Sequence, residues 1–485
     1  MTSFLIALAV LILGYFIYGG IVERVFQTDP SRKTPATTMT DGIDYVEMPT
    51  WRVYLIQFLN IAGVGPIFGA IMGIMYGPAA FLWIVLGTIF AGAVHDFMSG
   101  MISLRLGGKS LPEIVGSELG RKVKMVMSVF ACVLLLMVIA VFVRTPANLL
   151  ATLTPEHLNA TFWAICIFLY YILATLLPVD KLIGNLYPIF GFALLFMAVG
   201  IMGYMIFNGV AIPDGFSEGL FNRHPAGEAA PIFPMMCISI ACGAISGFHA
   251  TQSPMMARCL NNEKHGRKVF YGAMVSEGIV ALIWAAAAIA FTGGYEKLAG
   301  YMAENGSDAG ILVHDVCVSW LGTFGGILAI LGVIAAPITT GDTAMRSLRL
   351  IISDSLNLNQ KKFIKRLLVT LPIIAVCFLL LNINFDVLWR YFAWCNQTLS
   401  IFTLWACSVY LARNRKAYLI TMIPAMFMTA LCTSFICYAP LGAYVEGIGL
   451  PLYVSEGIGL VAMAVCTVLF LRWQRLLSPT PDLAE

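Results

Sequence analysis

The chain has 485 residues, of which 59% are hydrophobic and 11% are charged, and its formal net charge is +3. Soluble domains carry about 25% charged residues, so this composition excludes an ordinary soluble protein and indicates an integral membrane protein in a lipid bilayer. The net charge is small, and the basic residues lie in short loops rather than in one patch. Nucleic acid is therefore not an expected partner.

Long apolar stretches predict the transmembrane segments. At about 20 apolar residues for each span, the chain contains thirteen candidates. No basic region precedes the first stretch, so it is expected to be a retained helix and not a cleaved signal. The candidates lie near residues 3–23, 52–75, 77–104, 123–143, 160–177, 186–208, 231–257, 269–291, 309–336, 364–382, 387–411, 418–438 and 453–472.

Basic residues between these segments fall almost entirely into one set of alternating loops. Of the 29 Lys and Arg residues, only Arg144, Arg223, Lys297 and Arg390 belong to the other set. Because loops rich in Lys and Arg stay in the cytoplasm, the N-terminus is predicted outside and the C-terminus inside. A missed or invented helix would scramble the alternation, so the pattern also supports the number of segments.

Two of the expected segments are interrupted by glycine. Residues 57–66 read QFLNIAGVGP, and residues 241–249 read ACGAISGFH. Backbone groups freed at bilayer depth must be satisfied by protein or by a watery cavity, so paired interruptions point to the binding site of a transporter. Alternatively, the glycines only let helices pack closely. We favour a binding site because the two interruptions occupy corresponding places.

Counting segments relates the two interruptions to each other. Segments two to six and seven to eleven form two groups of five, and each group opens with its broken helix. Five is odd, so the second group enters the membrane from the opposite side, which predicts a 5+5 inverted-repeat core of the leucine-transporter type. A single membrane domain, 1–485, is expected. Its parts are a peripheral first helix and inner loop (1–51), the repeats (52–208 and 231–411), and two peripheral C-terminal helices with a tail (412–485).

The interrupted segments supply the candidate substrate-binding residues. Amides and helix N-termini beside the glycines are expected to hold a carboxylate through the half-helix dipoles, while freed carbonyls face a cation or ammonium group. Polar side chains add hydrogen-bonding groups. The candidates are Asn60, Gly63, Gly65, Pro66, Gly243, Ser246, Gly247 and His249.

Buried ionisable residues are the first candidates for ion coupling. Charged groups at membrane depth are costly, so His95, Asp96 and Glu277 are expected to be functional. Glu277 or His95 could carry a coupling proton. The alternative is that all three residues lie near the interface as structural partners of Lys and Arg in the inner loops.

Hydroxyl groups suggest a second coupling site, for sodium. Thr339, Thr340 and Thr343 could hold the ion together with carbonyl groups near Gly63, because hard cations prefer oxygen ligands. Asp342 lies among these threonines. The alternative is a Thr/Asp cap at the start of a cytoplasmic helix. No cofactor or other metal is expected, since the twelve cysteines show no Cys-x-x-Cys spacing.

Several local motifs resemble the carbon starvation (CstA) family. They are DGIDYV at 41–46, IAGVGP at 61–66, AGAVHDF at 91–97, GKSL at 108–111, SGFH at 246–249 and TTGDTAMR at 339–346. The resemblance implies a bacterial inner-membrane uptake system for peptides or pyruvate, usually proton-driven and related to the amino acid, polyamine and organocation superfamily. Ile56-Gln57 stands where a His-His pair is expected in the family's long members.

Common enzyme motifs are absent from the sequence. It contains neither the P-loop pattern of ATP-driven systems nor a Gly-x-Ser-x-Gly nucleophile elbow. The expected function is secondary active import of a small organic nutrient by alternating access, coupled to an ion gradient, with a proton expected as the coupling ion. Alternatives are a sodium-coupled amino-acid transporter and a passive channel. The oligomeric state is left open.

Overall fold

The computed structural model describes residues 1–42, 45–176, 179–305, 309–356, 358, 363–383, 385–439 and 447–476. These residues form helices joined by loops, with one isolated β-bridge between Met48 and Leu260. The prediction of an all-α protein is confirmed for this part of the chain. Ile43 and Asp44 of the first family motif lie outside the described residues.

The helices follow in close succession, and short π or 3-10 turns are labelled η. The first half contains α1 (Thr2–Phe26), α2 (Pro35–Thr38), α3 (Thr50–Ala62), α4 (Gly65–Ile74), α5 (Ala79–Gly87), η1 (Thr88–Gly92), α6 (Ala93–Arg105), α7 (Leu111–Leu119), α8 (Arg121–Leu153), α9 (Ala160–Leu176), α10 (Val179–Phe207) and α11 (Gly215–Glu218). The second half contains η2 (Gly227–Ala229), η3 (Ile232–Met236), α12 (Cys237–Ser239), α13 (His249–Ala257), η4 (Glu263–His265), η5 (Arg267–Tyr271), α14 (Gly272–Thr292), α15 (Tyr295–Glu304), α16 (Ala309–Ala329), η6 (Ile330–Ala335), α17 (Ala336–Ser355), α18 (Phe363–Leu380), α19 (Phe385–Arg413), α20 (Leu419–Tyr438) and α21 (Leu452–Leu476).

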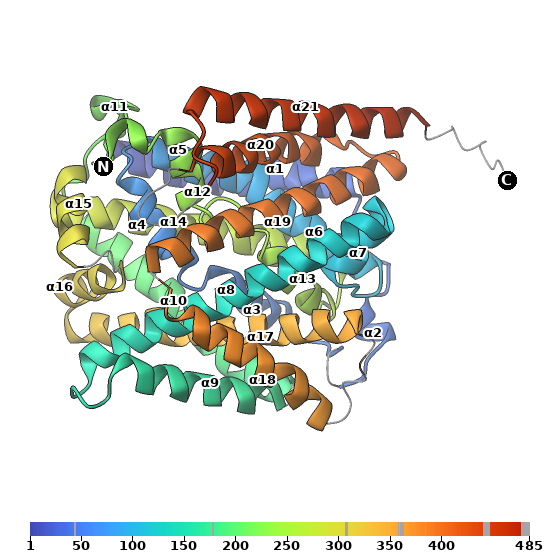
Figure 1. Cartoon of the computed structure of the whole chain (residues 1–485), viewed down its shortest axis with the longest axis horizontal. Helices are drawn as coiled ribbons and strands as arrows, with labels where there is room; N and C mark the ends of the chain where they lie inside the picture. Colours follow the sequence, from blue (N-terminus) through green and yellow to red (C-terminus); the bar gives the residue numbers. More distant parts are fainter. Residues whose placement is uncertain are drawn as a thin grey trace.

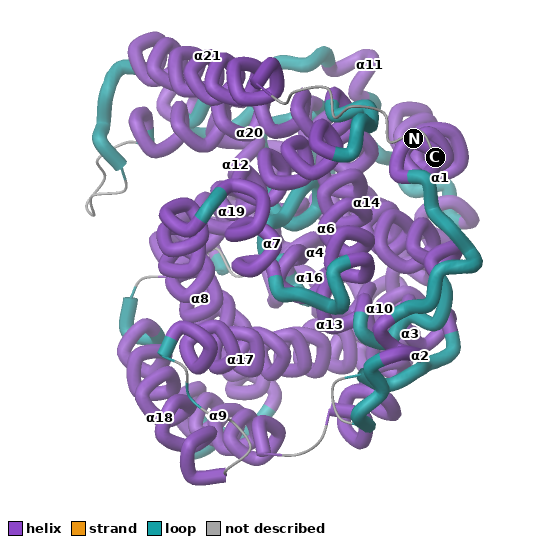
Figure 2. The backbone as a smooth tube through the Cα atoms, turned by 90° about the vertical axis from the view of Figure 1, so that its right-hand side faces the viewer, coloured by secondary structure: helices purple, strands orange, loops and turns teal. Residues whose placement is uncertain are grey.

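The long helices run roughly side by side and surround a central group. In Figure 1, α11 and α15 lie at the end that holds the N-terminus, whereas α2 and α7 lie at the opposite end. Figure 2 looks along the bundle and shows α20 and α21 at one edge and α9 and α18 at the other. Helix α14 lies in the middle, where it contacts α3, α4, α5 and α6.

Outward-facing apolar side chains identify the surroundings as lipid. Eight described helices are long and apolar enough to cross a membrane, or nine if the bent pair of α3 and α4 is one span. Phe16 of α1 is 63% exposed and Val461 of α21 is 63% exposed, whereas Trp284 of α14 is fully buried. Such exposed apolar faces are stable only in a bilayer. A multi-pass membrane protein is confirmed, and the thirteen spans and the inverted repeat stay predictions.

Both predicted helix interruptions are present. Helix α3 ends at Ala62, Gly63 adopts φ 41° and ψ −137°, and α4 begins at Gly65 with a bend of 46°. A positive φ of this kind suits glycine because it has no Cβ. The second interruption is longer, since α12 ends at Ser239 and α13 begins at His249.

The helix at the segment predicted near 309–336 extends beyond it. Helix α16 is kinked at Gly322 (φ 63°, ψ −152°), and the π-type turn η6 then leads into α17, which ends at Ser355. Thr339, Thr340, Asp342 and Thr343 therefore lie inside α17, and the alternative that they cap a new helix is wrong.

A buried carboxylate ties three parts of the fold together on the α2 and α7 side. Glu263 is fully buried and accepts hydrogen bonds from Arg105 Nε (2.9 Å) and Nη2 (3.1 Å) and from the backbone N–H of Asp29 (2.7 Å). Arg105 also donates to the carbonyl of Gln27 (2.6 Å). The end of α6 is thereby joined to the loop after α1 and to the loop after α13.

We expect Glu263→Ala to lower the free energy of unfolding by about 3–5 kcal/mol, because it leaves a buried arginine without its partner. Thermal unfolding of the purified protein in detergent measures the change. Glu23→Ala is the matched control: Glu23 pairs with Arg267 at 3.2 Å in a partly exposed position, where the loss should stay below about 1 kcal/mol. Equal effects of the two substitutions would contradict this assignment.

Candidate transport site

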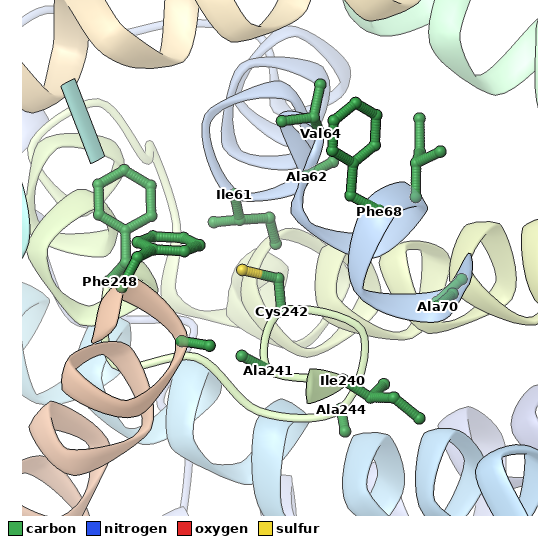
Figure 3. Close-up of a cluster of buried hydrophobic side chains, with 14 of the residues drawn as sticks. Ile61, Ala62, Val64, Phe68, Ala70, Ile240, Ala241, Cys242, Ala244 and Phe248 are labelled. Atoms are coloured by element: carbon green, nitrogen blue, oxygen red, sulfur yellow. The ribbon is translucent and has the colours of Figure 1, made fainter. Parts of the chain in front are cut away.

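The two helix interruptions pack directly against each other. A Cβ on Gly65 would lie 2.5 Å from Sγ of Cys242, and a Cβ on Gly243 would lie 3.9 Å from Cα of Pro66. Figure 3 shows this meeting point, with Cys242 between Ile61 of the first interruption and Ala241 of the second. Segments that lie far apart in the sequence are thus in contact, and a binding site at this contact stays a prediction.

Asn60 brings an unpartnered amide to this site. Its side chain is fully buried, and neither its oxygen nor its nitrogen has a hydrogen-bond partner among the described residues. A buried amide without partners loses its hydration without compensation, which costs about 1–3 kcal/mol. Its neighbour Gln57 differs, because its Nε2 donates to Ser253 Oγ at 3.3 Å. Asn60 therefore stands out as a group that a ligand can satisfy.

The freed backbone of the second interruption is satisfied largely by one residue of α19. Asn396 accepts the backbone N–H of Gly247 with its carbonyl (2.9 Å) and that of Phe248 with Oδ1 (2.8 Å). Ser246 Oγ also donates to Oδ1 (2.9 Å). The amide of Gly247 and the hydroxyl of Ser246, both expected to face a substrate, are thus already bonded to the protein in this conformation.

Other polar side chains donate hydrogen bonds to backbone carbonyl groups in and near this interruption. Thr88 donates to the carbonyl of Gly243 at 3.0 Å, and Gln397 donates to the carbonyl of Cys237 at 2.8 Å. Asn396, Gln397 and Thr88 are not among the residues predicted from the sequence. The available signal was the pair of adjacent amide side chains at 396–397 in the mostly apolar α19.

The predicted ionisable residues meet in one buried chain. Asp96 accepts hydrogen bonds from Nδ1 of His95 and from Nδ1 of His249, each at 2.8 Å. Nε2 of His249 then lies 3.4 Å from Oε2 of Glu277. All four side chains are fully buried. The chain runs from α6 through α13 to α14, beside both interruptions.

This arrangement tests the structural alternative for these residues, while their role in ion coupling stays a prediction. His95, Asp96 and Glu277 were alternatively expected near the interface, paired with Lys and Arg of inner loops. That alternative is wrong, because their partners are one another and His249. Neither oxygen of Glu277 receives a hydrogen bond from the described residues. His249, expected among the substrate-binding residues, instead connects the two carboxyl groups.

Cys242 places a thiol sulfur, a soft metal ligand, beside His249 and Glu277. Sγ of Cys242, a ring nitrogen of His249 and a carboxyl oxygen of Glu277 lie within 4.8 Å of one another. Transition-metal ions accept these donor types, so this is where the described residues could hold such an ion. Asn396 Nδ2 lies 3.3 Å from the sulfur. Cys242 is not among the site residues predicted from the sequence.

Of the three threonines predicted to hold sodium, Thr340 reaches the first interruption. Its hydroxyl donates to the carbonyl of Leu59 (3.1 Å), one turn before Gly63. The hydroxyls of all three threonines also lie within hydrogen-bond distance of carbonyls of α17, Thr340 at 3.0 Å from that of Ala336. Asp342 is fully buried, and its Oδ1 lies 3.3 Å from Arg346 Nε.

Solved structures define the class of fold. The manganese transporter of Eremococcus coleocola, crystallised with an aromatic bis-isothiourea substituted compound, matches 90% of this chain and 98% of its own, with a TM-score of 0.54 and 13% sequence identity. Crystal structures of two mutants of that transporter each match with a TM-score of 0.52 and 14% identity. At this level of identity the likeness shows the fold alone.

The chain belongs to the family described as carbon starvation protein CstA, which matches residues 1–159 and 154–319. The resemblance drawn from the motifs is thereby confirmed. An uncharacterized membrane protein of Haemophilus influenzae is 44% identical over 339 residues, covering 60% of this chain and 91% of the relative.

Two relatives with functional names match less of their own length. The peptide transporter CstA of Campylobacter jejuni is 29% identical over 343 residues, covering 57% of this chain and 48% of the relative. The pyruvate/proton symporter BtsT of Escherichia coli is 27% identical over 366 residues, covering 61% of this chain and 49% of the relative. The chain thus spans about half the length of these two relatives. Their names describe transporters and not enzymes.

We expect Gly247→Ala to lower the free energy of unfolding by about 1–3 kcal/mol, the usual range for overpacking. The added Cβ would lie 2.4 Å from the backbone nitrogen of Ser400 and 2.5 Å from the carbonyl oxygen of Asn396. Gly300→Ala in α15 is the control, because no atom lies within 4 Å of its added Cβ. Thermal unfolding should show a loss for the first variant only, and an unchanged Gly247→Ala would contradict the packing argument.

Proposed function

We propose that this protein is a secondary active importer of a small organic nutrient that works by alternating access in the bacterial inner membrane. The observation that carries the proposal is the contact between two helix interruptions beside a fully buried chain of ionisable groups. Irregular backbone and charged groups are both costly at membrane depth, and transporters combine them at substrate and ion sites.

The proposed scaffold is a core of two inverted repeats within thirteen membrane helices, with the N-terminus outside. Its two broken helices open the repeats and enter the membrane from opposite sides. Rocking of one repeat against the other would then expose the meeting point of the interruptions to each side in turn. The positions of the two interruptions and the charge of the loops support this plan.

The proposed substrate is a small carboxylate, either pyruvate-like or a short peptide, taken up under carbon starvation. Asn60 supports the assignment because its amide is buried and unpartnered at the first interruption. An amide offers both a donor and an acceptor, which suits a carboxylate or a peptide group. The names of the relatives from Campylobacter jejuni and Escherichia coli favour the same two substrate classes.

A proton is the proposed coupling ion, and Glu277 is its proposed carrier. Asp96 is held by two histidines, whereas Glu277 has one ion-pair contact, to His249. Asp96 and Glu277 both contact the imidazole of His249, so adding a proton to Glu277 removes one of the two negative charges beside this ring. The hydrogen bonds from His249 through Asp96 to His95 offer a path for the proton toward α6. Movement of α13 or α14 would break the His249–Glu277 contact, which links the proton to the conformation.

Glu277→Gln should abolish uptake driven by a pH gradient while leaving substrate exchange at equal pH intact. One pH unit supplies about 1.4 kcal/mol per proton, enough for about tenfold accumulation by a one-to-one symporter. The measurement is uptake of labelled pyruvate and labelled dipeptide into proteoliposomes with an alkaline interior. The glutamine keeps the shape of the side chain but cannot carry the proton.

Glu304→Gln is the control for this experiment, because Glu304 is exposed on α15 and should leave accumulation unchanged. Accumulation by Glu277→Gln that still follows the pH gradient would contradict its role as carrier. Conductance that follows voltage without any accumulation by the unchanged protein would favour a channel and contradict the transporter proposal.

Sodium is the second candidate coupling ion, and the contact between Thr340 and the carbonyl of Leu59 favours it. A hydroxyl and a backbone carbonyl at one helix interruption are oxygen ligands of the kind that a hard cation takes. If sodium drives part of the uptake, Thr340→Val should remove the sodium-stimulated component. Thr339→Val should keep it, because the hydroxyl that contacts the carbonyl of Leu59 belongs to Thr340 and not to Thr339. Equal responses of both variants to a sodium gradient would exclude this site.

A further inference from the structure

Three polar atoms beside the second interruption are buried without a hydrogen-bond partner among the described residues. They are Nε2 of His249 and both carboxyl oxygens of Glu277. Nε2 lies 3.4 Å from Oε2, but the two atoms form no hydrogen bond. Leaving a buried polar group bare costs about 1–3 kcal/mol. Unpartnered groups of this kind indicate an ion or molecule that completes the site.

The orientation of the His249 ring explains the missing hydrogen bond. Its Nδ1 donates to Oδ2 of Asp96 at 2.8 Å, and the other oxygen of Asp96 is held by His95. A neutral ring with its proton on Nδ1 presents a lone pair at Nε2. Nε2 and the carboxylate of Glu277 are then two acceptors that face each other, and a cation between them stabilises both.

Cys242 is the observation that points to a metal ion. A proton can also lie between His249 and Glu277, but a proton needs no soft ligand beside it. Sγ of Cys242 lies within 4.8 Å of a ring nitrogen of His249 and of a carboxyl oxygen of Glu277. Asn396 donates from Nδ2 to this sulfur at 3.3 Å. Such a contact stabilises the thiolate, which is the form of cysteine that binds metals.

The spacing of the donors fits a tetrahedral ion. Metal–nitrogen and metal–oxygen bonds of about 2.0–2.2 Å place two ligands of a zinc ion about 3.4 Å apart. His249 Nε2 and Glu277 Oε2 have this separation. A thiolate about 2.3 Å from the ion lies about 3.6 Å from each of the other ligands, so the sulfur has to move by at most about 1.2 Å.

The charges around the donors also favour a cation. Among the described residues, the carboxyl groups of Asp96 and Glu277 form ion pairs with histidines and with no Lys or Arg. A divalent ion bound by one thiolate and one carboxylate forms a neutral unit, and coordination is a usual way to offset the cost of buried charges. The hydrogen bond from His249 to Asp96 is the contact that typically orients a metal-binding histidine.

We propose that Cys242, His249 and Glu277 bind a divalent transition-metal ion of the zinc class and leave one ligand position open. Sulfur and imidazole nitrogen select such an ion over Mg²⁺ and Ca²⁺, which prefer oxygen ligands. The inference goes beyond the proposed function and does not depend on it. An ion bound here occupies the carboxyl group that the proposed function gives to the coupling proton, so the two cannot be bound together.

The test is a titration of the purified protein, treated with a chelator and kept in detergent, with Co²⁺ as the spectroscopic probe. We expect one equivalent of Co²⁺ to give a thiolate-to-cobalt charge-transfer band in the near ultraviolet and the intense visible bands of a tetrahedral ion. Zn²⁺ should remove these bands and Mg²⁺ should not. Absence of the charge-transfer band, or its removal by Mg²⁺, would overturn the proposal.

Cys242→Ser should remove the charge-transfer band, because the sulfur is lost while the size of the side chain is kept. Asp96→Asn should keep the band and weaken Co²⁺ binding about 10- to 100-fold, as expected for a residue that positions a ligand. The matched control is Cys466→Ser, because Cys466 is a partly exposed cysteine of α21; it should keep both the band and the affinity. Thermal unfolding without metal checks that each variant is folded. A folded Cys242→Ser protein that retains the band would overturn the proposal.

Uptake in proteoliposomes separates this inference from the proposed function. Zn²⁺ should inhibit proton-driven uptake of labelled pyruvate or dipeptide by the unchanged protein, with less inhibition in Cys242→Ser relative to its own uptake without zinc. Proton-driven uptake by a protein that gives no cobalt bands would overturn this inference alone. Cobalt bands that depend on Cys242, in a protein that shows no uptake, would contradict the proposed function alone.

Discussion

The backbone at the centre of this protein leaves the helical path, and its amides and carbonyls must find partners where no bulk water is available. The backbone groups of the two interruptions find their hydrogen-bond partners in different ways. At the second, the freed groups are bonded by the side chain of Thr88 in η1 and by Asn396 in α19. Asn396 accepts hydrogen bonds with both its backbone carbonyl and its side-chain Oδ1. At the first, the turn is only two residues long, and Thr340 reaches across from α17 to the carbonyl of Leu59. Helices α17 and α19 are therefore held to the site by hydrogen bonds as well as by apolar packing.

The same requirement explains how closely the central helices pack. Glycine at 65 lets the two interruptions approach to a distance that a Cβ would prevent, and glycine at 243 and 247 does the same for the second interruption against α14 and α19. Close packing and a binding site were alternative explanations of these glycines from the sequence. In the structure, Cys242 packs against Gly65, and its sulfur also lies within 4.8 Å of a ring nitrogen of His249 and a carboxyl oxygen of Glu277.

Much of the fold could be predicted from the sequence because it depends on local properties of the chain. The glycine in QFLNIAGVGP predicted an interruption because a positive φ at Gly63 is a local property of the chain. Individual ionisable residues could be selected because their cost in a membrane is also local. Their meeting could not be predicted: Asp96 and His249 are 153 positions apart, and only the packing of α6 on α13 joins them. Asn396 was missed for the same reason, since its role depends on a backbone 148 positions away.

The position of Cys242 makes its accessibility depend on whether the two interruptions stay in contact. Its sulfur lies where a side chain on Gly65 would stand, so it fills the contact between the two interruptions. In this arrangement the thiol is buried and out of reach of water-borne reagents. Any motion that opens a path between the interruptions must draw this sulfur away from Gly65 and wet it. If the protein works by the proposed alternating access, the rate at which an alkylating reagent modifies Cys242 therefore measures how often the contact between the interruptions opens.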